Sequence, residues 1–530
     1  MKVFTVADMV AAEKAADSLG HSYALMMELA GRGIAEAIMG RGEMKTSRVL
    51  ILVGAGNNGG DGLVAGRYLA EAGAIVTVYL SQQRDDDNFH RLPKPNVNIV
   101  YHYEDQTLDQ LYRLASNCDV LIDALLGTGV TRPITGNFAS ILRQVAAARG
   151  AWKQPDRSRT LLSNLAQIKT VWPLVVAVDC PSGLNCDTGE IDPLALSADL
   201  TVTFAGPKRG HFIFLGAAAC GELEVVDIGI DPQLTDAIPI DVATPARMQQ
   251  ILPQRPLDGH KGTFGSVLIA GASADYLGAP ILSAFGALRA GSGLVALAVP
   301  QTVRNIAATQ LPEATYPLMP DEVYLGSDSA ETLQSILPKY KALLLGPGLG
   351  QQSDSFLTSL FLASLLGTLT LPPLVLDADA LNYLAGQTNW WEHIPANSIL
   401  TPHPGEMARL AKIDMRGQDR IAVAQMYAQK WRQIVVLKGA YTVIATPDGH
   451  STLIPVATPL LAIAGSGDVL AGIIASLLGQ GAPPEEAAVL GAYLHATVGK
   501  RLTDTFGDAG LLAREIADAL PSLRQTLALW

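Results

Sequence analysis

The sequence is poor in charged, cysteine and aromatic residues. Of its 530 residues, 17% are charged, 6% are aromatic and four are cysteine. The low charged fraction, together with 49% apolar residues, excludes a disordered chain and a coiled coil. The four cysteines form no CxxC pair, so we expect reduced thiols in a cytoplasmic protein and no disulfide framework.

Cationic clusters and uninterrupted apolar runs are also missing. The net charge is −12 and no Lys/Arg-rich block occurs, so nucleic acids and anionic membranes are poor candidates as partners. Asp8 and Glu13 stand where a signal peptide would need an apolar core. The most apolar run, residues 360–376, is interrupted by Pro372-Pro373 and by threonines, which favours a buried helix and a strand over a membrane span.

What the chain does contain is glycine, 50 residues of it, in a length that calls for two or three domains. Five prolines within residues 231–256 mark a boundary. We therefore expect a first domain over residues 1–235, a proline-rich linker over 236–256 and a second domain over 257–530. Residues 147–170 have a poor pattern and are expected to form an inserted surface loop.

The first 40 residues predict two helices. Asp8 and Ser22 are candidate N-caps, Gly20 is a stop signal, and apolar residues recur near helical spacing over residues 25–38. This hairpin could pack on its own domain or on a second subunit, and packing on its own domain is favoured.

A buried strand over residues 49–53 runs into a glycine-rich segment, residues 54–62, and a helix over 63–72. The segment satisfies G-x-G-x-x-G. A dinucleotide-binding dehydrogenase would show an acidic residue at the end of the next strand, residues 74–80, and none is there. Asn57 and Asn58 are foreign to that fingerprint, and their side-chain oxygens suit a cation such as K⁺ or a polar ligand. The dehydrogenase interpretation is therefore disfavoured.

Acidic residues end two further predicted strands of the first half. Asp123 follows residues 120–122, and Asp179 follows residues 175–178, with Ser182 shortly after it. Each Asp alone would be read as a strand-ending turn residue. Because ligands gather at the carboxyl ends of parallel strands, three such ends with glycine loops favour one shared crevice, with Asn58 as its fourth member.

The second half repeats the plan of strands that end in glycine or acidic residues, over about seven strand-like runs. His403 lies between two prolines that fix its backbone, which favours a ligand contact over a structural role. Lys438 ends the apolar run 434–437 and precedes a glycine, a suitable place for nucleotide phosphates, although a solvated loop charge is the alternative.

The most informative stretch is residues 461–478, where Gly465-Ser466-Gly467-Asp468 opens a long apolar helix. Glycine-flanked N–H groups at the positive end of a helix form an anion site. A carboxylate there repels an anion unless it moves a proton. Asp468 is therefore either a helix cap or a catalytic group, and this motif alone does not decide.

Taken together, the motifs carry a resemblance that covers nearly the whole chain. Lys-Gly-x-Phe-Gly, Gly-Pro-Gly-Leu-Gly, Asp-Ala-Asp-Ala-Leu, Thr-Pro-His-Pro-Gly-Glu, Leu-Lys-Gly and Ala-Gly-Ser-Gly-Asp-Val-Leu-Ala-Gly resemble the ADP/ATP-dependent NAD(P)H-hydrate dehydratases. Asn-Asn-Gly-Gly-Asp-Gly, Asp-Ala-Leu-Leu-Gly-Thr-Gly and Val-Asp-x-Pro-Ser-Gly resemble NAD(P)H-hydrate epimerases. The resemblance implies an α/β protein with an N-terminal Rossmann-like doubly wound domain followed by a C-terminal ribokinase-like α/β domain.

The resemblance also implies an activity, the repair of hydrated NADH and NADPH. The first half would interconvert the R and S epimers at C6, and the second half would dehydrate the S epimer at the expense of ADP. The expected partners are these small molecules and further copies of the chain in a homo-oligomer. The expected ions are K⁺ at the epimerase site and Mg²⁺ with the nucleotide.

Residue roles are carried over by motif. The catalytic residues would be Asp179 in the first half and Asp468 in the second, each also in contact with the hydrate. K⁺ would be held by Asn58, Asp123 and Ser182. The first half would bind the hydrate through Asn57, Asn58, Gly59, Gly60, Asp61, Gly127, Thr128, Gly129, Val130, Thr131, Arg132 and Pro133. The second would bind it through Ala279, Gly348, His403 and Asp468, and the nucleotide through Lys438, Gly439, Ala440, Tyr441, Thr442 and Gly467.

Two other functions share parts of this pattern. A vitamin or sugar kinase would have the second half but no need for the segment 57–61. A non-enzymatic dinucleotide-binding regulator would have the glycine loops but no use for an acid at Asp468.

Overall fold

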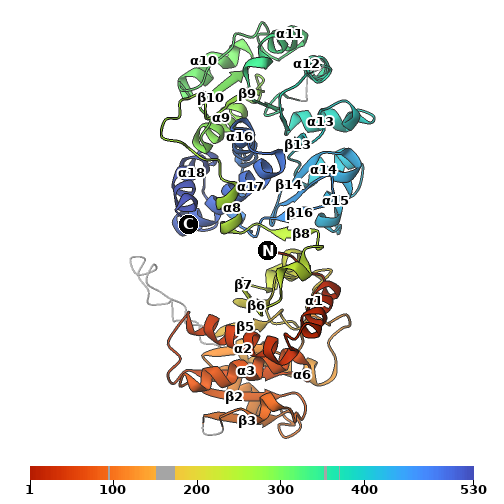
Figure 1. Cartoon of the computed structure of the whole chain (residues 1–530), viewed down its shortest axis with the longest axis vertical. Coiled ribbons are helices and arrows are strands. Elements are labelled where there is room, and N and C mark those ends of the chain that lie inside the picture. The colour runs from red at the N-terminus through yellow and green to blue at the C-terminus, as the bar shows by residue number, and fades with distance from the viewer. Residues whose placement is uncertain (94–95, 151–172, 351–354, 369, 530) are drawn as a thin grey trace. The chain divides into compact units, whose positions relative to one another are not determined.

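The computed structural model describes residues 1–93, 96–150, 173–350, 355–368 and 370–529. The chain forms two compact units, one of Lys2–Ile238 and one of Pro239–Trp530 together with Met1 (Figure 1). Each unit has its own sheet and its own core. Within the described residues no helix is both long and apolar enough to cross a bilayer.

The first unit is built on a seven-stranded parallel sheet of order β3-β2-β1-β4-β5-β6-β7. The order reverses between β1 and β4, the switch point at which doubly wound folds bind ligands. Its strands are β1 Arg48–Val53, β2 Ile75–Leu80, β3 Val97–Tyr101, β4 Val120–Ala124, β5 Leu174–Val178, β6 Leu200–Phe204 and β7 Glu222–Val226. Its helices are α1 Val6–Ser18, α2 Tyr23–Met39, α3 Asn57–Glu71, α4 Asp87–His90, α5 Asp109–Asn117, α6 Gly136–Gly150 and α7 Gly216–Ala219.

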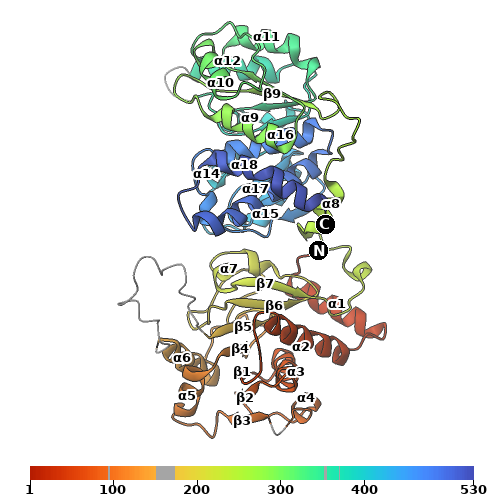
Figure 2. The same ribbon diagram turned by 90° about the vertical axis from the view of Figure 1, so that its left-hand side faces the viewer.

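Alternation along the central strand separates two cores. Val49, Ile51 and Val53 pack with α1, α2 and α3, whereas Leu50 and Leu52 pack with α5 and α6. Figure 2 shows these two groups of helices on opposite faces of the sheet. Because side chains alternate across a strand, a continuous apolar run is what a strand covered on both faces requires.

The N-terminal helix pair forms as predicted, with one correction. Thr5, and not Asp8, is the N-cap of α1, and Asp8 completes a capping box from three residues on. Ser22 caps α2, and Gly20 has the left-handed backbone expected of a helix stop. Helix α2 packs against α3 in the core of this unit.

The second unit contains a nine-stranded sheet of order β10-β9-β11-β12-β13-β14-β15-β16-β8. β14, β15 and β16 pair antiparallel and all other neighbours are parallel. The strands are β8 Ile240–Val242, β9 Ser266–Ala270, β10 Leu294–Ala298, β11 Ala342–Leu345, β12 Leu374–Leu376, β13 Ile399–Leu400, β14 Ile434–Leu437, β15 Val443–Ala445 and β16 Ser451–Leu453. The helices are α8 Pro245–Ile251, α9 Ala279–Ala290, α10 Gln301–Gln310, α11 Ser327–Ile336, α12 Ser355–Leu366, α13 Asp379–Gly386, α14 Pro404–Ala411, α15 Arg420–Trp431, α16 Ser466–Gly479, α17 Pro484–Phe506 and α18 Ala513–Ala528.

Helices α9 and α16 pack very closely on this sheet (Figure 1). A Cβ at Gly472 would lie 1.9 Å from the carbonyl oxygen of Ser283, and one at Gly286 would lie 2.5 Å from that of Val469. The two helices therefore cross on glycines, and this contact sets the position of the first turn of α16.

The segment 236–256, expected to be a linker, belongs mostly to the second unit. β8 pairs with β16 at the sheet edge, and α8 begins at Pro245, where the missing N–H costs nothing. Proline is tolerated in an edge strand of a sheet and at the first position of a helix. The prediction of a linker from proline content alone was therefore wrong for this segment. Of the expected inserted loop, residues 147–150 end α6, and residues 151–170 lie outside the described residues.

Candidate active sites

The first site lies at the carboxyl end of β1, where the chain turns directly into α3. The predicted loop 54–62 is shorter than expected, because α3 already begins at Asn57. Gly54 and Gly59 let neighbouring backbone segments pack closely at this turn. A Cβ on either residue would lie within 2.2 Å of a backbone oxygen. Residues 57–61 are thus the first turn of a helix, whose N–H groups face the switch point.

The structure brings together the three residues predicted to hold a cation. Ser182 Oγ donates to Asp123 Oδ1 at 2.6 Å, and the Ser182 N–H donates to Asp123 Oδ2 at 2.9 Å. Asn58 Nδ2 donates to the carbonyl oxygen of Leu126 at 3.2 Å, and Ser182 Oγ lies 3.3 Å from the same oxygen. All three side chains are buried. Carboxylate, hydroxyl, amide and carbonyl oxygens are the donor set of a hard cation.

Asp179 lies beside this cluster in a buried ion pair that the sequence did not reveal. Its Oδ1 accepts from Lys208 Nζ at 2.5 Å and from Thr203 Oγ1 at 2.8 Å. Burial alone would raise the pKa of Asp179, but the Lys208 ammonium and these hydrogen bonds hold it below its usual value. Asp179 is therefore a carboxylate held in its charged form.

Two further acids face this pair. Burial, followed by the charge of Asp179, raises the pKa of Asp61 well above its usual value. The same two causes, in the same order, raise the pKa of Glu13, which is half-buried on α1. The first site therefore places one carboxyl group with a lowered pKa next to two whose pKa values are raised.

The remaining predicted contacts of the first half form an exposed loop. Residues 127–133 follow β4, and the Ile134 N–H, which donates to Asp192 Oδ2 at 2.8 Å, anchors the end of the loop. Gly127 lies against Asn58, where a Cβ would come within 3.2 Å of that side chain. Arg84, which we did not predict, donates to the carbonyl oxygens of Gly54 and Gly56 and so holds the neighbouring loop.

The second site is centred on the first turn of α16. Gly465 occupies the N-cap position with a left-handed backbone, and Asp468 follows three residues later, so Asp468 is not the helix cap. Burial, followed by the nearby charge of Asp377, raises the pKa of Asp468 to about 7. A carboxyl group with this pKa can take up and release a proton near neutral pH.

Lys438 is not a solvated loop charge. Its Nζ donates to Asp377 Oδ1 at 2.7 Å and lies 3.7 Å from Glu406 Oε2, and its side chain is 17% exposed. A Cβ on Gly467 would lie 3.4 Å from the same Nζ, so the ammonium borders the anion site of α16. Burial raises the pKa of Glu406 to about 7. Neither Asp377 nor Glu406 was among the predicted site residues, although Asp377 opens the Asp-Ala-Asp-Ala-Leu motif and Glu406 ends the Thr-Pro-His-Pro-Gly-Glu motif.

His403 caps α14 through its own ring. Nδ1 accepts from the N–H groups of Gly405 and Glu406 at 3.0 and 3.4 Å, and Pro404 occupies the first helical position. Burial, then the charges of Lys438 and Arg409, lower the pKa of His403. Because Nδ1 accepts both hydrogen bonds, the ring carries its proton on Nε2, and the side chain remains exposed to a ligand.

Gly348 and Ala279 meet at the switch point between β9 and β11. Gly348 has a left-handed backbone, and a Cβ there would lie 2.8 Å from the carbonyl oxygen of Tyr276 and 3.2 Å from Ala279 Cβ. The two residues therefore form one surface, as their predicted contact with a single ligand requires.

The loop 438–442 depends on an arginine that the sequence pattern did not single out. Arg420 donates from Nη1 to the carbonyl oxygen of Ala440 at 2.7 Å and from Nη2 to those of Leu437 and Lys438 at 3.0 and 2.9 Å. A Cβ on Gly439 would come within 2.7 Å of this guanidinium. Sequence distance hides such a contact, because Arg420 is on the helix that precedes β14.

In the part of the chain that the structure describes, no group of three or more His, Cys, Asp or Glu side chains could hold a metal ion.

Comparison with known proteins gives the same division of the chain. The sequence model of the family described as NAD(P)H-hydrate dehydratase matches residues 267–522, and that described as YjeF-related protein N-terminus matches residues 23–210. A bifunctional NAD(P)H-hydrate repair enzyme of Moorella thermoacetica is 38% identical over 520 residues, which cover 95% of this chain and 92% of the relative. That of Thermofilum pendens is 33% identical over 539 residues, 99% of this chain and 97% of the relative.

A solved structure matches the second unit. The ADP/ATP-dependent NAD(P)H-hydrate dehydratase of Bacillus subtilis, co-crystallised with ATP and Mg²⁺, is 32% identical. The match covers 55% of this chain and all of that protein, with a TM-score of 0.47.

Proposed function

The chain belongs to the family of bifunctional NAD(P)H-hydrate repair enzymes, and from this premise we propose how its two sites divide the work. The unit Lys2–Ile238 epimerises the hydrates of NADH and NADPH at C6, and the unit Pro239–Trp530 dehydrates the S epimer at the expense of ADP. The observation that carries the second assignment is Asp468, a carboxyl group with a pKa of about 7 beside the anion site of α16.

Dehydration needs activation because hydroxide is a poor leaving group. The C6 oxygen of the hydrate attacks the terminal phosphorus of ADP, the bond from that phosphorus to its bridging oxygen breaks, and AMP leaves. Asp468 accepts the C6 hydroxyl proton during this transfer. Loss of phosphate from C6 and of a proton from C5 then restores the C5–C6 double bond of the reduced nicotinamide.

The surrounding residues supply charge and position. Lys438, with the N–H groups of Gly467 and the loop 439–442, binds the nucleotide phosphates, and Ala279, Gly348 and His403 bind the hydrate. The Lys438 ammonium is held by Asp377 and Glu406, so it can contact phosphate without binding Asp468 directly. A Mg²⁺ ion, as co-crystallised with the Bacillus subtilis relative, would enter with the nucleotide and offset the charge of its phosphates.

Epimerisation in the first unit uses two carboxyl groups whose pKa values are shifted in opposite directions. Asp61, whose pKa burial raises, gives a proton to the C6 hydroxyl, the C6–O bond breaks to release water, and the N1 lone pair forms a C6=N1 iminium. Water then adds to the opposite face of C6 and gives its proton to Asp179, which Lys208 holds as a carboxylate. Environments that drive two neighbouring pKa values apart are typical of acid–base pairs. The segment 57–61 and the loop 127–133 hold the hydrate. Asn58, Asp123 and Ser182 would hold K⁺, whose charge would stabilise the carboxylates near it.

We further propose that the enzyme acts in the cytoplasm as a homo-oligomer. All four cysteines are free and buried, which suits a reducing compartment. On the N-terminal helix pair, Leu19, Tyr23 and Leu25 are exposed apolar side chains that a second copy could cover.

The test of the proposed function uses a mixture of both hydrate epimers and follows the absorbance of reduced nicotinamide. With ADP, the enzyme should restore all of the coenzyme and release one AMP and one phosphate for each molecule restored. Without ADP it should only equilibrate the epimers. Accumulation of a stable phosphorylated product would instead indicate a small-molecule kinase.

A further inference from the structure

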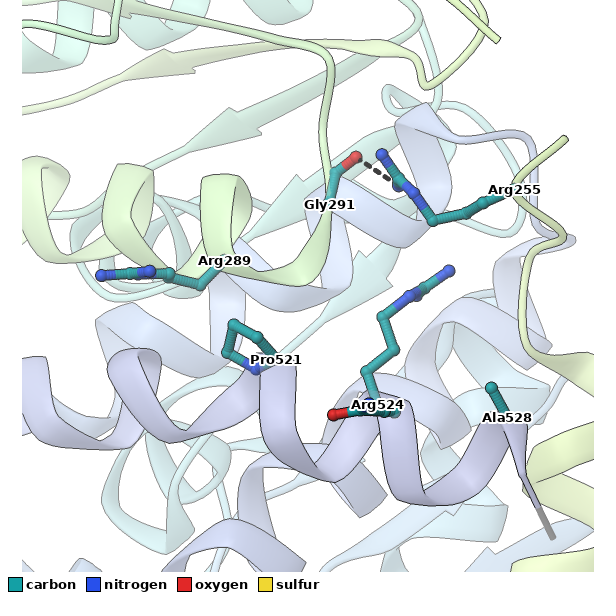
Figure 3. Close-up of a pocket in the computed structure, with 7 residues that line it drawn as sticks. Arg255, Arg289, Gly291, Pro521, Arg524 and Ala528 are labelled. Carbon is teal, nitrogen blue, oxygen red and sulfur yellow. Dashed lines mark hydrogen bonds between the residues drawn. The ribbon is translucent and has the colours of Figure 1, made fainter. Parts of the chain in front are cut away.

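Two arginines that have no acidic partner among the described residues share a cavity away from the residues assigned above. The cavity, about 340 Å³ in volume, is lined by Arg255, Arg289, Gly291, Pro521, Arg524, Gln525 and Ala528 (Figure 3). It therefore lies between the segment before β9, the end of α9 and helix α18. Its volume is at the lower end of the range for small-molecule sites.

The cavity is separate from the second active site. Gly291 ends α9, whose first residue is Ala279, and a helix of twelve residues is about 18 Å long. Gly291 also precedes β10, so the cavity is at the amino edge of the parallel strands, whereas the glycine loops and Asp468 are at the carboxyl edge. A ligand in the cavity would therefore not occupy the nucleotide or hydrate site.

Both guanidinium groups are held in place by uncharged groups. Arg255 stacks on the ring of Phe264, with Cζ 3.8 Å from the ring centroid, and donates from Nη1 to the carbonyl oxygen of Gly291 at 2.9 Å. Arg524 donates from Nη2 to the carbonyl oxygen of Pro253 at 2.7 Å, and its buried Nη1 has no hydrogen-bond partner. Figure 3 shows the Arg524 side chain extending from α18 toward Arg255.

Neither arginine has a carboxylate within ion-pair distance among the described residues. Arg289 differs, because its Nη2 donates to Asp518 at 2.7 Å and its side chain points away from the other two in Figure 3. Burial, followed by the positive charge of Arg255, lowers the pKa of Arg524 to about 10. An anion between two like charges that face each other in partial burial would offset their repulsion.

We propose that this cavity binds a phosphate group, either free phosphate or the phosphoryl group of a small monoester, between Arg255 and Arg524. A phosphate dianion matches two cations in charge, and its oxygens can accept paired hydrogen bonds from each planar guanidinium. A monocarboxylate would neutralise only one. Arg255 is exposed and Arg524 is half-buried, so a small anion can enter from solvent and reach both.

The test is calorimetric titration of the intact protein with inorganic phosphate at constant ionic strength. Saturating ADP is present, and no hydrate, so that the anion site of α16 is occupied and no reaction occurs. One phosphate should bind, with acetate binding much more weakly. Arg524→Gln should weaken phosphate binding about tenfold or more, because it removes charge-assisted hydrogen bonds to the phosphate. Arg289→Gln removes the same charge from the same neighbourhood and should bind phosphate as the unchanged protein does.

Arg255→Gln provides a second variant should Arg524→Gln fail to fold, since Arg255 is exposed. It should also lose about tenfold or more in phosphate affinity. A titration with AMP in place of phosphate identifies the source: AMP binding as tightly as phosphate indicates a monoester, and weaker AMP binding indicates the free anion. Absence of phosphate binding in the presence of ADP, or equal weakening in Arg289→Gln, would overturn the proposal.

Discussion

Each of the two sites contains one lysine, buried in the first and half-buried in the second, and one central aspartate, and the pKa values of the two aspartates are shifted in opposite directions. In the first unit Lys208 binds Asp179 directly and lowers its pKa. In the second unit Lys438 binds Asp377 instead, and burial raises the pKa of Asp468 to about 7. The comparison shows that direct pairing with a lysine lowers the pKa of the first aspartate, whereas burial without such pairing raises that of the second. The residue type at the end of a strand or the start of a helix does not by itself determine the direction of the pKa shift.

The largest effect is expected at Asp468. Asp468→Asn keeps the anion site of α16 but removes the proton acceptor, so dehydration should fall about 10²–10⁴-fold while ADP still binds. Stopped-flow absorbance for the rate and calorimetry for ADP measure the two separately. The control is Asp414→Asn, which replaces an exposed acid of the same unit that pairs with Arg416, and its rate should be unchanged. An Asp468→Asn enzyme with normal turnover would contradict the assigned role.

Asp179→Asn should damage both the activity and the stability of the first unit. Epimerisation should stop, so a mixture of hydrates is repaired only to the fraction present as the S epimer, apart from slow spontaneous epimerisation. The variant also leaves the Lys208 ammonium buried without its counter-charge, which costs about 3–5 kcal/mol of unfolding free energy.

Denaturant unfolding of the first unit checks this cost against a surface pair of the same kind. Asp119→Asn removes the partner of Arg48, an exposed pair that contributes about 0–1 kcal/mol. Equal destabilisation by the two variants would show that the Asp179–Lys208 pair is not specially dependent on its charge.

The next effect in size is the pH dependence, which should differ between the two sites. Because Asp468 acts in its ionised form, dehydration under saturating substrate should lose about tenfold per pH unit below about pH 7 and reach a plateau above it. The same raised pKa means that the folded state holds this proton more tightly than the unfolded state does. The contribution of Asp468 to stability is therefore present below its unfolded pKa and is lost as pH rises toward 7.

Asp179 has the opposite sign, since its lowered pKa contributes stability above the unfolded value and loses it as pH falls through the folded one. Thermal melting of the intact protein at pH 8 should accordingly show Asp468→Asn more stable than the unchanged protein and Asp179→Asn less stable. A shift of the melting temperature in the same direction in both variants would contradict the opposite pKa shifts of the two aspartates.

The smallest expected effect concerns the separation of the units. A fragment ending at Ile238 should fold and epimerise the hydrates without ADP at nearly the rate of the full chain, because its sheet and cores are complete. Ending it at Asp231 should cost stability, since Ile238 is buried in that core and its carbonyl oxygen accepts from Lys2 Nζ at 2.9 Å. Circular dichroism and an epimerisation assay distinguish the two ends, and a requirement for ADP would mean that the sites are shared.

Most elements that position the sites could be predicted from sequence. The strands before Gly54, Asp123 and Asp179 are continuous apolar runs, which is the pattern of strands covered on both faces. Asn58, Asp123 and Ser182 were expected to converge because parallel strands share a carboxyl edge, and their hydrogen bonds confirm that they do. The predicted contacts of these residues with hydrate, nucleotide and cation remain predictions.

The errors have a common origin in short-range signals. Proline content misassigned β8 and α8 as a linker, and glycine content extended the loop before α3 by six residues that belong to the helix. Proline and glycine restrict or free the backbone locally, but pairing with β16, or packing against a neighbouring turn, decides whether the segment is regular.

The sequence by itself determined the two-unit α/β organisation, the family and the aspartates at the two centres. The periodicity of apolar residues, the glycine loops and the order of the motifs can all be read directly along the chain. Only the tertiary structure decided which aspartate is ionised. Lys208 lies 29 residues from Asp179, Asp377 lies 61 residues from Lys438, and Arg420 lies 17 residues from Leu437. No local pattern in the sequence pairs these residues with one another. Charge state follows from distance and burial, and these exist only once the chain has folded.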